Sequence, residues 1–291
     1  MKLGVSGQIL GTKYDLAETL RIIRGYQVDH IEIWPCNIAP VGEVISPDSY
    51  EGWDVASAAK ILKENGMQVS AVSFSGAFNR ELTADPDKYS EELCRTVEVA
   101  HALGARFVNH YCYYLSMEEL DFGRLHRCFD RALELAQRLG VDLVLENEAH
   151  DQSGTARGML KILEEFDHPS FKTNFDATNY YHASEEGYPY AYQLLKPHIG
   201  YVHLKNGSVF HPELGDSETF RGAAMSGAMS GHDIYYPFIW QGAVNIDGLL
   251  ERLKQDDYEG FCVLEPHCPV EHIPMFLLTD LTYIRKRCDA E

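Results

Sequence analysis

The sequence contains few basic residues. Lys and Arg together number 25 against 44 Asp and Glu, which gives a formal net charge of −19 at pH 7. An excess of negative charge of this size repels both nucleic-acid phosphates and anionic membrane surfaces. We therefore expect neither nucleic acid nor a membrane as a partner.

Long apolar runs and a secretion leader are also lacking. No stretch approaches the length needed to span a membrane. The N-terminus Met1–Ser6 enters a strand pattern directly, without a basic segment followed by an apolar stretch and a cleavage site. The seven cysteines form no C-x-x-C pair and are scattered over positions 36, 94, 112, 128, 262, 268 and 288. These features indicate reduced thiols, and we expect a cytoplasmic protein.

What is present is a repeat of helix, glycine and strand. Gly25, Gly66, Gly104 and Gly140 each follow a helical pattern and precede an apolar or β-branched segment. Helices are predicted near 15–24, 56–64, 86–103, 125–139, 158–166, 190–195, 246–253 and 273–287. Strands are predicted near 3–6, 29–34, 68–74, 106–111, 141–146, 171–176, 200–203 and 261–265.

Eight strands, each followed by a helix and with no change of composition between the halves, favour an α/β fold of the (β/α)₈ TIM-barrel type. The alternative is an open, doubly wound sheet. The chain of 291 residues fits one such barrel, so we expect a single domain over 1–291. Residues 206–245 are too long for an ordinary connection and form a predicted functional loop after strand seven.

Four predicted strands end in a metal-binding residue type. The run Val141–Glu146 delivers a carboxylate to the end of an apolar strand, and Asp176, His203 and Glu265 end the next three strands. Because all strand ends of a barrel meet at one rim, these four side chains are predicted to converge. Ligation by oxygen with one imidazole favours Mn²⁺, Mg²⁺ or Co²⁺ over a structural zinc. One divalent metal, Mn²⁺ first, is the predicted cofactor.

The order of these residues resembles a known superfamily. Glu146-Asn147, Asp176 followed by Asn179, His203-Leu204-Lys205 and Glu265-Pro266 are similar to the motifs of the xylose-isomerase-like TIM barrels, the sugar phosphate isomerases and epimerases. The resemblance covers nearly the whole chain. Its members include ketose 3-epimerases, hydroxypyruvate isomerases, inosose dehydratases, C-glycoside deglycosidase subunits and endonuclease IV.

The resemblance implies the same metal ligands here and leaves the reaction open. Many members have His where this chain has Asn179, and Asp where it has Asn206. Both changes remove charge from the rim. Asn179 and the net charge of −19 count against the endonuclease branch, which uses additional His and Glu ligands.

These observations together predict a metal-dependent sugar isomerase or epimerase. Chelation of a ketose carbonyl and the neighbouring hydroxyl would stabilise a metal-bound enediolate, while Glu146 and Glu265 exchange the carbon-bound proton. The alternative is a lyase on a keto-sugar or keto-inositol, of the inosose dehydratase or C-glycoside deglycosidase type, with His150 or His110 as the acid or base. A non-catalytic carbohydrate-binding subunit is the third reading.

Further residues are assigned to the substrate. His110 and His150 follow strands four and five and suit hydroxyl contacts or proton transfer. Lys205 shares a strand face with His203 and could neutralise an alkoxide, although an ion-pair role fits equally well. Trp34 could stack on a sugar ring. The remaining candidates are Asn179 and the loop residue Arg221.

Partners follow from the same reading. No glycine-rich phosphate loop is present near the last two predicted strands, so an unphosphorylated sugar or glycoside is the expected substrate. A homo-oligomer is expected, with a small second subunit if the protein is a deglycosidase.

Overall fold

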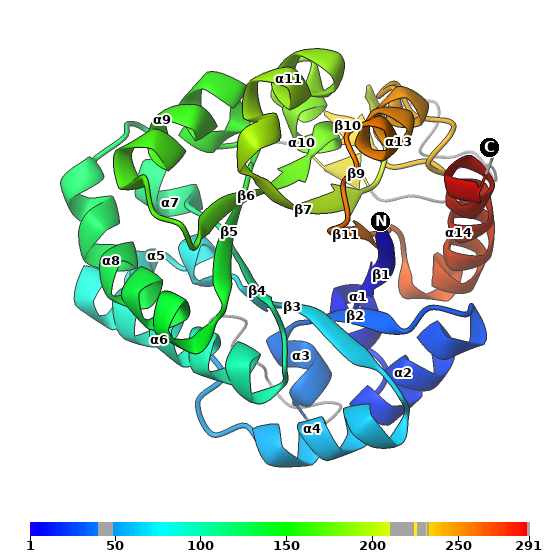
Figure 1. Cartoon of the computed structure of the whole chain (residues 1–291), viewed down its shortest axis with the longest axis horizontal. Coiled ribbons are helices and arrows are strands. Elements are labelled where there is room, and N and C mark those ends of the chain that lie inside the picture. Colours follow the sequence, from blue (N-terminus) through cyan, green and yellow to red (C-terminus); the bar gives the residue numbers. More distant parts are fainter. Residues whose placement is uncertain (40–48, 210–223, 226–230, 232, 290–291) are drawn as a thin grey trace.

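The computed structural model describes residues 1–39, 49–209, 224–225, 231 and 233–289. Eight parallel strands form a closed barrel in the order β1-β11-β7-β6-β5-β4-β3-β2, with helices around the outside (Figure 1). The barrel strands are β1 (Lys2–Ser6), β2 (His30–Ile33), β3 (Gln68–Phe74), β4 (Phe107–His110), β5 (Asp142–Glu146), β6 (Phe171–Asp176), β7 (Ile199–Leu204) and β11 (Phe261–Leu264). Pairing of β1 with β11 closes the ring, which confirms the predicted barrel and excludes an open sheet.

Helices follow the strands around the ring. The described helices are α1 (Gln8–Gly11), α2 (Leu16–Gly25), α3 (Pro35–Ile38), α4 (Val55–Glu64), α5 (Arg80–Thr83), α6 (Pro86–Ala102), α7 (Tyr113–Ser116), α8 (Phe122–Leu139), α9 (Ala156–Phe166), α10 (Ala177–His182), α11 (Tyr192–Leu195), α13 (Ile246–Gln255) and α14 (Ile273–Asp289). Short turns are the 3-10 segments η1 (Gly76–Phe78), η2 (Gln152–Gly154), η4 (Lys196–His198) and η5 (Val270–His272), and the π-helical η3 (Gly187–Ala191). None of the described helices has the length and apolar character needed to cross a membrane.

Local chemistry sets where the long helices begin and end. Asp15, Asp54, Asp85 and Asp121 each accept a hydrogen bond from the backbone N–H three residues later, which caps α2, α4, α6 and α8. At the other end, the glycine that follows α8, Gly140, has φ 70°. This left-handed conformation favours glycine and turns the chain from helix into strand.

The barrel interior changes from apolar to polar along its axis. Ala71, Phe107, Val144, Tyr201 and Val263 fill one layer and are buried against one another. Side chains two residues apart on a strand share a face, so His203 points into the barrel as Tyr201 does. Polar side chains therefore occupy the interior at the carboxyl ends of the strands, where barrel enzymes place their active sites.

The predicted long loop contains a small sheet of its own. Strands β8 (Ser208–Val209), β9 (Ala224–Met225) and β10 (Ile234–Tyr235) pair antiparallel in the order β8-β10-β9. Immediately after β10, Tyr236 is buried at 2% exposure and lines the pocket described below. This end of the loop packs against the barrel mouth. The predicted substrate residue Arg221 lies outside the described residues.

Candidate metal centre and substrate pocket

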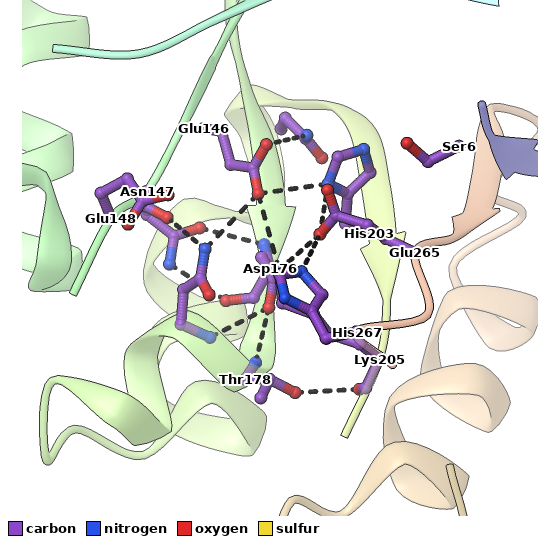
Figure 2. A network of polar contacts seen from close by, with 12 residues as sticks. Ser6, Glu146, Asn147, Glu148, Asp176, Thr178, His203, Lys205, Glu265 and His267 are labelled. Carbon is purple, nitrogen blue, oxygen red and sulfur yellow. Dashed lines mark hydrogen bonds and ion pairs between the residues drawn. The ribbon is translucent and has the colours of Figure 1, made fainter. Parts of the chain in front are cut away.

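Four acidic and imidazole side chains meet at the carboxyl ends of neighbouring strands (Figure 2). Glu146 ends β5, Asp176 ends β6, His203 lies in β7 and Glu265 directly follows β11. One ligand atom from each of these four buried residues lies within 4.8 Å of all the others. The structure thus brings together the four residues that the sequence places at consecutive strand ends.

The geometry of this cluster fits a divalent cation. Bonds from such a cation to oxygen or nitrogen are about 2.0–2.6 Å long, so ligands on opposite sides stand roughly 4–5 Å apart. The observed limit of 4.8 Å matches this spacing. Asp176 Oδ2 is buried and lies 2.8 Å from the ammonium group of Lys205. A buried carboxylate oxygen in this state suits a ligand to a cation.

Lys205 lies among the same carboxylates. Its Nζ is 2.8 Å from Asp176 Oδ2, 2.5 Å from Glu265 Oε2 and 3.9 Å from Glu146 Oε1. Burial would lower the pKa of Lys205, but Asp176, Glu265 and Glu146 outweigh it and raise the pKa well above its usual range. The ammonium group therefore stays charged and partly balances the acidic cluster.

Neighbouring positive charges also keep the carboxyl group of Glu265 ionised. Burial by itself would raise its pKa, but Lys205, His203 and the hydrogen-bonded His267 hold the pKa well below its usual range. His267 Nε2 lies 3.1 Å from Glu265 Oε2. The contacts of Glu265 with these three partners all involve Oε2. Glu265 is therefore ionised and is held through Oε2.

Glu146 is oriented by amides on the neighbouring strands. Its Oε2 accepts hydrogen bonds from Asn109 Nδ2 at 2.9 Å and from Asn174 Nδ2 at 3.1 Å. This arrangement turns Oε1 towards His203 Nδ1, which lies 3.1 Å away. Asn179 also approaches Oε1 with its Nδ2 at 3.4 Å. The carboxylate is thus held in one orientation at the centre of the cluster.

The chain matches a known family in sequence. Residues 20–285 match the model of the xylose isomerase-like TIM barrel family. The chain belongs to this family. No sequence among the curated proteins matches the chain.

Solved structures of this fold include several enzymes. The probable 3-DHS dehydratase AsbF from Bacillus anthracis is 16% identical, with a TM-score of 0.71 over 100% of both chains. D-allulose 3-epimerase from Methylomonas sp. is 17% identical, with a TM-score of 0.68 over 99% of this chain and 97% of that one. The IOLI protein, solved with a zinc atom, is 15% identical, with a TM-score of 0.70 over 100% of both chains. At these identities the likeness establishes the fold.

The barrel of this protein has a cavity beside the cluster, with a volume of about 1010 Å³. Glu146 and Glu265 form part of its wall. The predicted substrate residues Trp34, Asn179 and Lys205 line it as well, together with the predicted acid–base residue His150. His150 Nδ1 lies 3.4 Å from Glu148, whose own pKa is raised by burial. These side chains are placed where they can contact a bound molecule.

His110 lies on the opposite face of its strand from the cluster. Its neighbour Asn109 points into the barrel and bonds Glu146, so alternation directs His110 outwards. There the imidazole is fully buried and packs against the rings of Phe129 and Phe171, at 5.0 and 5.9 Å. Burial lowers its pKa to about 3. The assignment of His110 to substrate binding or proton transfer is therefore corrected to a packing role.

Several residues of the site were missing from the sequence-based prediction. They are Glu32, Asn109, Asn174, His182 and His267. His182 lines the cavity and its ring lies 5.4 Å from that of His150. Glu32 lies inside β2 and contacts Nε2 of His203, whereas Glu146 and Glu265 lie near Nδ1. A charged residue inside the apolar segment 30–34 was the available signal for Glu32.

Proposed function

We propose that the protein is a divalent-metal-dependent isomerase or epimerase that moves a proton next to the carbonyl of a ketose. One observation carries the proposal. Glu146 Oε1 and Glu265 Oε2 lie 3.1 and 3.6 Å from the same atom, His203 Nδ1, although they come from strands on either side of β6 and β7. Both carboxylates also line the pocket. Two acid–base groups in the wall of the cavity therefore approach one atom of His203.

The metal would be held by Glu146, Asp176, His203 and Glu265, with Mn²⁺ preferred by the oxygen-rich donor set. When bound, it would polarise the substrate carbonyl and the adjacent hydroxyl and so acidify the neighbouring C–H.

Proton transfer then falls to the two glutamates. Glu265 is ionised, and its Oε1 is the atom that accepts the carbon-bound proton, since its other oxygen is occupied by Lys205 and His267. Glu146 supplies the second acid–base group through Oε1, on the other side of His203. Return of the proton from the opposite face inverts a carbon, and return to the adjacent carbon from the same face interconverts ketose and aldose.

Lys205 supports this chemistry through its charge. Its ammonium group lines the pocket and lies beside both Asp176 and Glu265. A fixed positive charge here stabilises negative charge that develops on a substrate oxygen.

The test is Glu265→Gln in D₂O. The variant keeps the size and one coordinating oxygen of Glu265 but loses the base. We expect it to bind Mn²⁺ in calorimetry and to exchange the substrate proton about 10²–10⁴-fold more slowly than the wild type. Exchange at the wild-type rate would assign the base to another residue. Ketoses, keto-inositols and 3-keto-glycosides serve as substrates, with proton NMR as the readout.

A lyase is the second candidate, and the position of His150 favours it. His150 lines the cavity beside Glu148, and in this reaction it would protonate the leaving group. Elimination produces a new unsaturated product in the same NMR experiment, whereas epimerisation incorporates deuterium without loss of substrate atoms. The spectrum therefore separates the two reactions.

A further inference from the structure

The walls of the pocket differ between the two halves of the barrel. The metal-binding cluster comes from β5, β6, β7 and the end of β11. The facing wall comes from the ends of β2, β3 and β4, and it is built from the aromatic rings of Trp34, Phe78, Tyr111 and Tyr113. One cavity therefore joins an acidic site to an aromatic wall.

Tyr111 connects the two parts. Its hydroxyl accepts a hydrogen bond from Asn109 Nδ2 at 3.2 Å, and the same amide group holds Glu146. Its ring packs edge-on against Phe78, with the centroids 4.9 Å apart, and the ring of Phe78 lies 4.9 Å from that of Tyr113. A continuous row of aromatic rings thus leads from the metal ligands to the rim.

Exposure rises from Tyr111 to Phe78. Tyr111 is 3% exposed, whereas Phe78 is 38% exposed and is one of the few large apolar side chains of the described surface that reach this value. Phe78 lies in η1 and Tyr113 begins α7, so both belong to segments that directly follow barrel strands. Exposed aromatic faces inside a cavity favour a flat or apolar ring as their ligand.

The size of the cavity leads to the same conclusion. Pockets of about 300–1,000 Å³ hold drug-sized molecules, so a volume of about 1010 Å³ exceeds what one six-carbon sugar requires. Beyond a sugar ring at the cluster, the cavity therefore has room for a second group beside the outer rings of the wall, Phe78 and Tyr113.

From these observations we propose that the substrate is a glycoside whose keto-sugar ring binds at the acidic cluster and whose aromatic second ring packs on Phe78 and Tyr113. This inference rests on the proposed function for its sugar ring and extends it by naming the substrate class. The second ring contributes to binding and takes no part in proton transfer.

Two matched probes test the inference. Methyl and phenyl 3-keto-β-D-glucopyranoside differ only in the group that would meet the aromatic wall. We expect the Mn²⁺-loaded protein to bind the phenyl compound about tenfold more tightly in calorimetry. Phe78→Ala removes most of this preference and leaves the affinity for the methyl compound unchanged. Because Phe78 is partly exposed, the variant is expected to fold.

Tyr190→Ala is the control, since Tyr190 is equally exposed at 40% but lies outside the cavity. It should leave both affinities unchanged. Equal affinity of the wild type for the two probes, absence of binding of either, or an equal loss for both in Phe78→Ala would each overturn the inference. Proton exchange with D₂O is followed separately. A tenfold phenyl preference without exchange of either probe would overturn the proposed reaction and support the aromatic subsite.

Discussion

His203 Nε2 lies 2.7 Å from Glu32 Oε2, and both side chains are completely shielded from solvent. The contact comes from β2. Hydrogen bonding at Nε2 fixes the ring orientation and leaves Nδ1 directed at Glu146 and Glu265. Ser73 and Asn109 in turn donate hydrogen bonds to Glu32 Oε1. Glu32 is thus the positioning residue for the only imidazole in the cluster.

Substitution of Glu32 should change metal affinity without removing a ligand. Glu32→Leu removes the hydrogen-bond acceptor for His203, and we expect Mn²⁺ affinity to fall about 10–100-fold. Glu32→Gln retains a carbonyl oxygen in the same place and should recover most of the affinity. Calorimetry with Mn²⁺ measures both.

Glu92→Gln is the matched control, because Glu92 is also buried but lies in α6, outside the pocket. It should bind Mn²⁺ as the wild type does. Wild-type affinity in Glu32→Leu would contradict the positioning role.

Metal content provides a direct test of the cluster itself. Asp176→Ala and His203→Ala each remove one of the converging ligands, and elemental analysis of the purified variants should show a large loss of bound metal relative to the wild type. Asp151→Asn is the control, since Asp151 is a buried carboxylate of the same region that lies outside the cluster. Full metal content in both Ala variants would place the metal elsewhere.

The positions of the four cluster residues could be predicted because a barrel gathers its strand ends at one rim. Glu146 and Asp176 end apolar segments, so their place in the fold follows once eight strands are recognised. His267 could not be found in this way, since it lies beyond the last strand and reaches Glu265 through a turn that no periodic pattern specifies. One-turn helices such as α7 are equally invisible to periodicity.

For His110, the alternation of side chains along its strand was more informative than its position at the strand end. In the predicted strand 106–111, residues Asn109 and Tyr111 share one face and His110 takes the other. Asn109 is polar and donates a hydrogen bond to Glu146, so the face of the strand that carries Asn109 and Tyr111 points into the polar interior of the barrel. The sequence does not say which face points inwards, and the position of His110 at the strand end therefore favoured an active-site role.

Removal of Lys205 should reveal the balance of charge in the cluster. In Lys205→Met the carboxylates of Asp176 and Glu265 lose their buried ammonium partner, and breaking such a pair costs about 3–5 kcal/mol. We expect a lower melting temperature in the metal-free variant. A cation that binds only the folded state should then stabilise the variant more than it stabilises the wild type.

Thermal unfolding with and without Mn²⁺ measures this difference. Lys172→Met is the control, because Lys172 pairs with Asp142 at 2.8 Å and lies 32% exposed, away from the cluster. Its melting temperature should respond to Mn²⁺ as the wild type does. An identical response in Lys205→Met would mean that the ammonium group does not share the site of the cation.

The packing role of His110 predicts a stability effect that depends on pH. Burial lowers its pKa to about 3, below the ordinary value of 6.5, so the folded protein keeps this imidazole neutral while the unfolded chain takes up a proton below pH 6.5. Proton uptake by the unfolded state alone makes the wild type lose stability as the pH falls from about 6.5 towards 3.

His110→Leu removes this proton and keeps an apolar side chain between Phe129 and Phe171. One pKa unit corresponds to about 1.4 kcal/mol, so relative to the wild type the variant should gain about 2 kcal/mol between pH 7.5 and pH 5. Urea unfolding at the two pH values measures the gain. Proton exchange on substrate should stay at the wild-type rate, because the side chain lies outside the pocket. If the variant has the same pH dependence of stability as the wild type and loses activity, the packing role is wrong and His110 belongs to the active site.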